Sequence, residues 1–177
     1  IWSEKNKRLL WRRLWVALAA VQADFGLVDK DQLADLEKHA EEVNVERALE
    51  IEAEIHHDLM AELKTFAEQA QLGGRILHLG ATSMDIEDNA DVLRTRQALL
   101  IIVDKLKDLL VIFAKQIDTW AELPVMAFTH LQPAEPSTLG YRLGLYAPDL
   151  LMDWEELLRI SAGLRGKGFR GAGGPSA

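Results

Sequence analysis

The sequence predicts an all-α fold, and three observations support that prediction. Apolar residues recur at three- and four-residue spacing through most of the chain. No stretch shows the convincing alternation of apolar and polar residues that marks a half-buried strand. The chain of 177 residues, 49% of them apolar, is also long enough to bury a substantial core. We therefore expect packed helices and no sheet.

Two helices are expected first. One covers residues 3–26, because its apolar residues share a face and Gly26 supplies a stop. A charged helix follows over residues 30–42, and either Asp29 or Asp31 is expected to cap its start. Together they begin a small helical domain.

A third helix is expected over residues 44–71. It places His56 and His57 at adjacent positions, which point about 100° apart around a helix. Histidines that bind a metal from one helix usually stand four residues apart and have further ligands at suitable spacing. The chain offers no such arrangement, so we expect no metal site.

The longest helix is expected over residues 86–121. Asp85 and Asp88 stand at its start, where negative charge interacts favourably with the helix dipole. Its central part is apolar on more than one face, and such a helix must be covered nearly all round. A chain of this size can hardly cover it alone. We therefore infer a helical bundle that is shared between subunits.

A polar segment over residues 125–136 follows, in which Pro133 and Pro136 prevent a simple helix. A last helix is expected from Pro136 to about Gly163. Pro148 lies inside it and predicts a kink or a local break. The polar segment and this break divide the second half of the chain.

The composition changes near residue 80, from charged helices to long apolar ones. We place a domain boundary there, with a helical domain over residues 1–82 and the first part of a helical-bundle domain over residues 83–177. The chain begins with Ile1 and stops within a glycine-rich segment. We therefore expect it to be part of a longer polypeptide.

Composition and charge narrow the possible partners. The net charge of −8 argues against a nucleic-acid partner, because binding phosphates requires a basic face. The absence of cysteine rules out disulfides and thiolate metal sites and fits a cytoplasmic protein. No signal peptide is visible, and the most apolar run, residues 98–103, is far too short to span a bilayer. We expect a soluble cytoplasmic protein without a membrane partner.

Two polar segments at helix ends, residues 78–85 and 128–134, carry the most chemistry. Imidazoles transfer protons near neutral pH, and hydroxyl and amide groups can hold carboxylate or phosphate. Gly80 lets the backbone approach a ligand closely. These segments favour an enzyme with an anionic substrate, although structural roles for the two histidines are the alternative. The side chains concerned are His78, Thr82, Ser83, Thr129, His130 and Gln132.

The glycine-rich segment 166–174 does not match either pattern of glycines that cradles nucleotide phosphates. A flexible loop that lines a site or crosses to another helix is the expected role.

Three motifs together resemble the adenylosuccinate lyase family of the fumarase/aspartase superfamily. They are the segments 77–85 and 128–134 and the run His57-Asp58-Leu59-Met60-Ala61. Their order and separations agree with the family, and the resemblance extends over essentially the whole chain. It implies a fumarase/aspartase-type fold and a cofactor-free β-elimination that releases fumarate from a succinyl-purine nucleotide. It also implies a homotetramer whose active sites are shared between subunits.

The resemblance also implies roles for individual residues. His130 is expected to be the general acid that protonates the departing nitrogen, and His57 is expected to assist it. The expected substrate-binding residues are Asp58, His78, Thr82, Ser83, Thr129 and Gln132.

Three differences from the family's pattern accompany the resemblance. The serine-rich segment that carries the family's catalytic base is absent, so the base is expected outside this sequence and this chain alone is expected to be inactive. His56 stands where the family usually has arginine, and residues 174–177 read Gly-Pro-Ser-Ala in place of Gly-Thr-Gln-Ala. The alternatives are another lyase of the superfamily, such as an argininosuccinate lyase-like or cycloisomerase-like protein, and an inactive helical oligomerisation module.

Overall fold

The structure is a computed structural model, and it describes residues 1–173. Its contacts divide the chain into two compact units, the first comprising Ile1–Thr95 with residues 165–173 and the second Arg96–Leu164. The predicted all-α class is confirmed, with one small pair of strands added. The domain boundary expected after residue 82 concerns the complete protein and stays a prediction.

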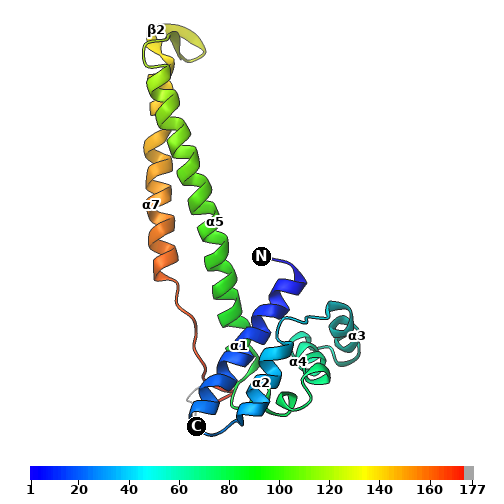
Figure 1. The fold of residues 1–177 in the computed structure, drawn as a ribbon. Coiled ribbons are helices and arrows are strands. Elements are labelled where there is room, and N and C mark those ends of the chain that lie inside the picture. The colour runs from blue at the N-terminus through cyan, green and yellow to red at the C-terminus, as the bar shows by residue number, and fades with distance from the viewer. Residues whose placement is uncertain (174–177) are drawn as a thin grey trace. The chain divides into compact units, whose positions relative to one another are not determined.

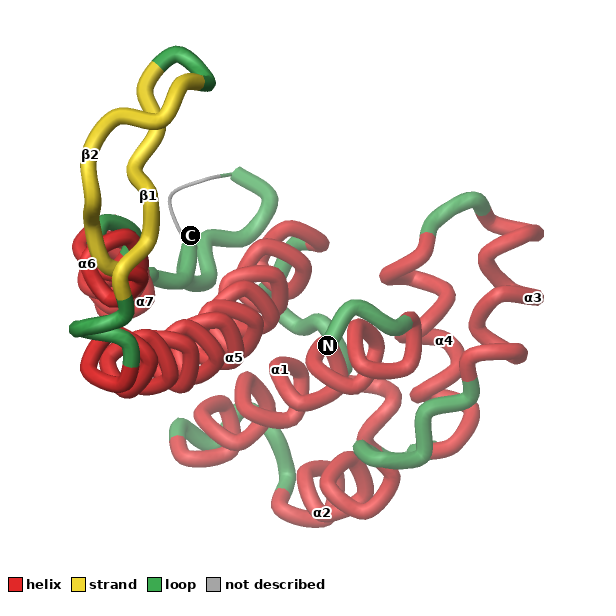
Figure 2. The backbone as a smooth tube through the Cα atoms, turned by 90° about the horizontal axis from the view of Figure 1, so that it is seen from above, coloured by secondary structure: helices red, strands yellow, loops and turns green. Residues whose placement is uncertain are grey.

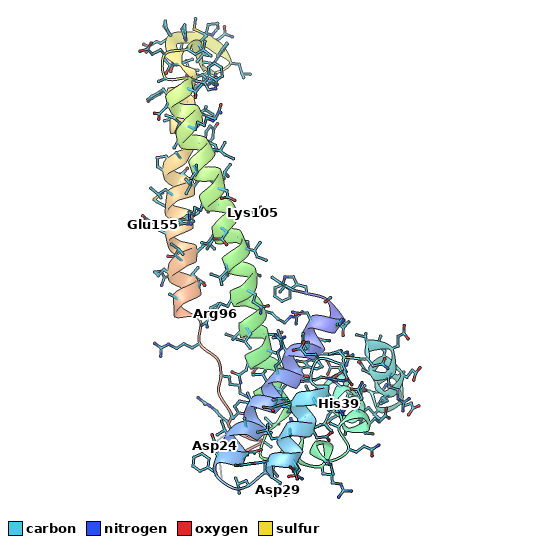
Figure 3. All side chains as sticks on the ribbon, viewed as in Figure 1. Asp24, Asp29, His39, Arg96, Lys105 and Glu155 are labelled. Carbon is cyan, nitrogen blue, oxygen red and sulfur yellow. The ribbon has the colours of Figure 1, made fainter. Side chains whose placement is uncertain are left out.

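The first unit begins with four helices and a short 3-10 turn. Ser3 caps the first helix by accepting a hydrogen bond from the N–H of Asn6. Asp29 forms a capping box with Gln32, so of the two candidates, Asp29 and Asp31, it is Asp29 that caps the second helix. Figure 3 labels Asp29 and His39 at the two ends of that helix. The elements, shown from blue to green in Figure 1, are α1 (Glu4–Asp24), α2 (Lys30–His39), α3 (Val45–Ile55), α4 (Asp58–Gln69) and η1 (Gly73–Ile76).

The prediction of a single helix over residues 44–71 is wrong, because α3 and α4 are separate helices. His56 ends α3 in the left-handed conformation, with φ of 55°, and its N–H donates to the carbonyl of Glu52. His57 then caps α4, with Nδ1 accepting a hydrogen bond from the N–H of Met60. The break has neither glycine nor proline, and left-handed backbone is uncommon in other residues. Apolar periodicity alone therefore predicted one continuous helix.

The core of the first unit holds α1 against α4. Trp15 and Phe66 are almost completely buried, with ring centroids 6.5 Å apart. Beside them, Arg8 and Arg12 are buried and both face the buried carboxylate of Glu62, at 3.6 and 2.5 Å. Removing one member of such a buried group costs about 3–5 kcal/mol, because the remaining charges lose their partner. This network fixes the start of α4 relative to α1.

The long helix α5 (Ser83–Thr119) has 37 residues and crosses the border between the units. It starts at Ser83, three residues before the predicted start. Asp85 accepts a hydrogen bond from the N–H of Thr82, as in one half of a capping box. Asp85 and Asp88 were expected to stand at the start of this helix. Instead, Thr82 precedes its first residue, and Asp88 lies a turn beyond Asp85.

In the second unit, the polar segment is a β-hairpin, so the prediction of no strand is wrong. Strands β1 (Pro124–Thr129) and β2 (Gln132–Thr138) are antiparallel, and Val125 pairs with Ser137. Figure 2 shows them in yellow, joined by one short turn. The residues of β1 are apolar on both faces, so no alternation is visible in the sequence. Proline is tolerated here because the sheet has only edge strands.

The helix expected from Pro136 begins later and is divided. Pro136 pairs with Met126 in the hairpin, and Thr138 caps α6 (Leu139–Gly144). The chain then breaks, and α7 (Ala147–Gly163) carries Pro148 in its first turn, which confirms the predicted break. Arg96, labelled in Figure 3, donates from Nη2 to the carbonyl of Leu164 at 2.6 Å and ties the end of α7 to α5.

Within the second unit, α5 exposes large apolar side chains. Five of them are between 48 and 63% exposed, namely Leu100, Ile101, Ile102, Val111 and Ile112. Clusters of this kind on a helix usually mark a contact surface. Within residues 1–173, no helix combines the length and the apolar character needed to cross a membrane.

Candidate functional site

The first unit brings two of the predicted site segments into contact. Nε2 of His57 lies 3.4 Å from Oγ of Ser83. His57 immediately precedes α4 and Ser83 is the first residue of α5, so the N-termini of two helices meet at this point. Helix N-termini favour anions, because their free N–H groups and their dipoles present positive charge. The pair therefore combines an imidazole and a hydroxyl in surroundings that favour a negatively charged ligand.

Asp58 lies next to this pair and has its own charged neighbours. It is the first residue of α4, and its Oδ2 lies 3.8 Å from Nζ of Lys7. Its carboxylate also interacts with the side chain of Glu87 of α5. Burial, together with the charge of Asp58, raises the pKa of Glu87 to about 7. Sequence reasoning missed Glu87, although it stands four residues after Ser83 on the same side of the helix.

His78 is held by the core. Its backbone is in the left-handed region, with φ of 69°. Nε1–H of the buried Trp15 donates to Nδ1 of His78 at 3.1 Å, so the neutral ring carries its proton on Nε2. Burial lowers the pKa of His78, and His57 lowers it further, while Asp85 opposes both. His78 is thus a neutral hydrogen-bond donor at neutral pH.

Asp85 has a larger role than the predicted helix cap. It is completely buried and accepts hydrogen bonds from Thr82 and from the segment 165–173. Burial opposes its ionisation, but the bonds from the N–H groups of Thr82 and Arg170 outweigh burial and lower the pKa of Asp85 to about 2. The glycine-rich segment therefore runs beside the candidate site. The spacing of three residues between Thr82 and Asp85 was the signal available in the sequence.

The remaining predicted residues lie at the tip of the hairpin in the second unit. Thr129 and Gln132 face each other as the last pair of the ladder. His130 and Leu131 form the turn, with φ of 47 and 63°, as in the hairpin turns that match the twist of the strands. Thr129, His130 and Gln132 are all exposed. In this turn the polar side chains stand at the end of the strands.

The structure thus divides the predicted site residues into two groups. His57, Asp58, His78, Thr82 and Ser83 gather in the first unit. Thr129, His130 and Gln132 gather in the second. That both groups serve one active site stays a prediction.

A cavity of about 590 Å³ opens beside the first group. It is lined by Leu49, Glu52, Ala53, His56, His57 and Asp58. The end of α3 and the start of α4 place both histidines on its wall. Among residues 1–173, no group of three or more His, Cys, Asp or Glu side chains is arranged to hold a metal ion.

The sequence matches the profile of a protein family described as "Lyase" over residues 2–174, and the chain belongs to this family. Among its relatives are adenylosuccinate lyases. That of Saccharomyces cerevisiae is 39% identical over 96% of this chain and 36% of its own length. That of Schistosoma mansoni is 36% identical over 99% of this chain and 37% of its own length. The resemblance inferred from the three motifs is confirmed.

The fold is also shared with solved structures. A fumarate lyase from Mesorhizobium sp. BNC1 superposes with a TM-score of 0.87 at 27% identity, over 96% of this chain and 41% of that chain. A 3-carboxy-cis,cis-muconate lactonizing enzyme from Pseudomonas putida superposes with a TM-score of 0.89 at 28% identity, over 98% of this chain and 41% of that chain. This chain spans less than half the length of the relatives and structures named here.

Proposed function

We propose that the full-length protein is an adenylosuccinate lyase of purine biosynthesis. It eliminates fumarate from adenylosuccinate to give AMP, and it splits the succinyl-aminoimidazole-carboxamide ribotide in the same way. The similarity to adenylosuccinate lyases from yeast, a flatworm and Archaeoglobus fulgidus, at 35 to 39% identity over at least 96% of the chain, carries this proposal. The enzyme works in the cytoplasm and needs no cofactor.

The reaction breaks a C–N bond and moves one proton at each end. A base, which lies outside this sequence, removes a proton from the carbon beside a carboxylate. The electron pair forms the C=C bond of fumarate as the C–N bond breaks. His130 gives a proton to the departing nitrogen, and His57 assists it. General acid catalysis of this kind contributes about 10²- to 10⁴-fold.

The groups in the first unit suit the charged parts of such a substrate. Two helix N-termini meet at His57 and Ser83, and preorganised donors at such places stabilise anions without reorganisation. We propose that His78, Thr82 and Ser83 hold phosphate or carboxylate oxygens, and that Asp58 also binds substrate. Thr129 and Gln132 line the succinyl side.

The proposal includes a homotetramer in which α5 joins a shared helical bundle. The exposed Leu100, Ile101, Ile102, Val111 and Ile112 support it, because burying a large aliphatic side chain contributes about 1.5–3 kcal/mol. In such an assembly, each active site draws residues from several subunits, which also explains why the two groups lie in different units of one chain.

The test is an ultraviolet assay of fumarate release by the full-length protein, with adenylosuccinate and argininosuccinate offered separately. We expect turnover of adenylosuccinate alone. Turnover of argininosuccinate without adenylosuccinate would assign the protein to another lyase of the superfamily. No turnover of either, by a folded oligomer, would point to an inactive oligomerisation module or to a cycloisomerase-like enzyme.

A further inference from the structure

One carboxylate joins two segments that are far apart in the sequence. Asp85 is completely buried in the first turn of α5 and receives four hydrogen bonds. Its Oδ2 accepts from the N–H groups of Thr82 at 3.1 Å and Gly171 at 2.8 Å. Its Oδ1 accepts from the N–H of Arg170 and from Nζ of Lys167, both at 3.1 Å. Oδ2 therefore accepts one hydrogen bond from the segment 165–173, and Oδ1 accepts two.

A second anchor lies one turn further along α5. The side chain of Asn89 donates to the carbonyl of Gly168 at 3.1 Å and accepts from its N–H at 3.2 Å. Asn89 also donates to the carbonyl of Asp85 at 2.7 Å, so the two anchors are connected. A Cβ at Gly166 would lie only 2.4 Å from Oδ1 of Asn89. Glycine at this position lets the segment lie flat against the helix.

The clamped segment touches the loop that carries the predicted binding residues. A Cβ at Gly171 would lie 3.6 Å from the carbonyl of Gly80, so the two backbones adjoin. Thr82, which ends that loop, is bonded to the same oxygen of Asp85 as Gly171. The conformation of the loop and the place of the segment therefore depend on one side chain.

We propose that Asp85 is a positioning residue for the lyase reaction: its carboxylate clamps the segment 165–173 beside the loop 78–83 and so sets the groups of that loop that bind the anionic substrate. The role of Asp85 in substrate binding rests on the proposed function, whereas the hydrogen bonds that form the clamp do not depend on it. A buried carboxylate that accepts four bonds holds its donors more strongly than a neutral group. Asparagine has only one acceptor oxygen, so its amide group would face two N–H donors in either orientation.

The experiment uses full-length protein and measures hydrogen–deuterium exchange at the amides of Arg170 and Gly171. In the Asp85→Asn variant at least one of these two amides is expected to exchange about tenfold faster or more, because the side-chain NH₂ replaces either the oxygen that accepts from Arg170 or the one that accepts from Gly171. Asp91→Asn is the matched control, since Asp91 is an exposed residue of the same helix. Wild-type protection of both amides in Asp85→Asn would overturn the clamp.

A second variant covers the case in which Asp85→Asn does not fold. Gly166→Ala leaves the buried charge in place but pushes Asn89 away from Gly168. It is expected to speed exchange at Gly168 and to weaken the clamp from its other anchor. Unchanged exchange at Gly168 and at Arg170 in this variant would contradict the proposal.

The kinetic arm separates positioning from mere structure. In Asp85→Asn we expect KM for adenylosuccinate to rise about tenfold or more while kcat changes less, since small displacements of binding groups are costly. Asp85→Glu, which keeps the charge, is expected to recover part of the KM. Faster exchange with wild-type KM and kcat would overturn the positioning role. If the wild type does not turn over adenylosuccinate, the proposed function fails, whereas the exchange experiment still decides the clamp.

Discussion

Nε2 of His57 lies 3.4 Å from Oγ of Ser83, although 26 residues separate them. The contact exists because His56 ends α3 in the left-handed conformation and His57 then caps α4. The buried network around Glu62 holds this start of α4 against α1. An imidazole and a hydroxyl thereby meet where two helices begin.

Replacing His57 tests its assigned role. We expect His57→Asn to lower kcat by about 10²- to 10⁴-fold, because proton transfer is lost while asparagine still caps α4. Fumarate release by the full-length protein measures the effect, and circular dichroism checks the fold. His39→Gln is the control, since His39 is the last residue of α2 and pairs with the exposed Glu42 beyond the helix. Equal losses in both variants would remove the special role of His57.

Trp15→Phe should change the titration of His78. The Trp15 N–H donates to Nδ1 of His78 and so favours the neutral ring. Without that donor, we expect the pKa of His78 to rise from its lowered position towards the ordinary value. NMR titration of the ring proton, assigned with a His78→Gln variant, measures it. A pKa that stays the same or falls contradicts this assignment of the hydrogen bond.

Glu87 should make stability depend on pH. Its pKa of about 7 in the folded protein lies above the ordinary 4.5, so the folded state binds this proton more tightly than the unfolded chain. The stabilisation is complete below about pH 4.5 and is lost as the pH rises through 7. We expect the Glu87→Gln variant to melt at a higher temperature than wild type at pH 8.5, with a smaller difference at pH 5.

Glu54→Gln serves as the control for Glu87, because it removes one negative charge from the exposed surface of α3. Its melting temperature should follow that of wild type at both pH values. If the difference in melting temperature between Glu87→Gln and wild type is the same at both pH values, Glu87 does not titrate with the raised pKa assigned to it.

The apolar surface of α5 should be needed for assembly. We expect Ile112→Lys in the full-length protein to shift the proposed tetramer to smaller species, because a charge replaces a large apolar side chain in the proposed bundle. Analytical ultracentrifugation measures the distribution. Lys105→Glu, on the same helix and labelled in Figure 3, is a control for surface charge. A tetramer that survives Ile112→Lys would place the subunit contact elsewhere.

Much of this architecture could be predicted from the sequence, because the helices have strong apolar periodicity and recognisable ends. Asp29 caps α2, and Pro148 divides the last helical stretch, as expected. The break at His56 could not be predicted, since a left-handed histidine leaves no glycine or proline in the sequence. The hairpin was missed because β1 is apolar at successive positions.

The candidate site was predictable only in part. His78 and His130 could be identified because they lie in polar segments at helix ends of a histidine-poor chain, whereas His57 was expected inside a helix and was identified only by the family resemblance. The wider role of Asp85 was not visible, because its partners at Arg170 and Gly171 are more than eighty residues away. Only the folded backbone brings those N–H groups to one carboxylate.

Mixing two inactive variants shows most directly whether the two groups of residues form one active site across subunits. Full-length His57→Ala and His130→Ala are each expected to be nearly inactive while remaining tetrameric. When they are mixed and reassembled in equal amounts, sites that take His57 and His130 from different subunits should regain about a quarter of wild-type activity by random assortment. Activity no higher than that of the separate variants would contradict the shared site.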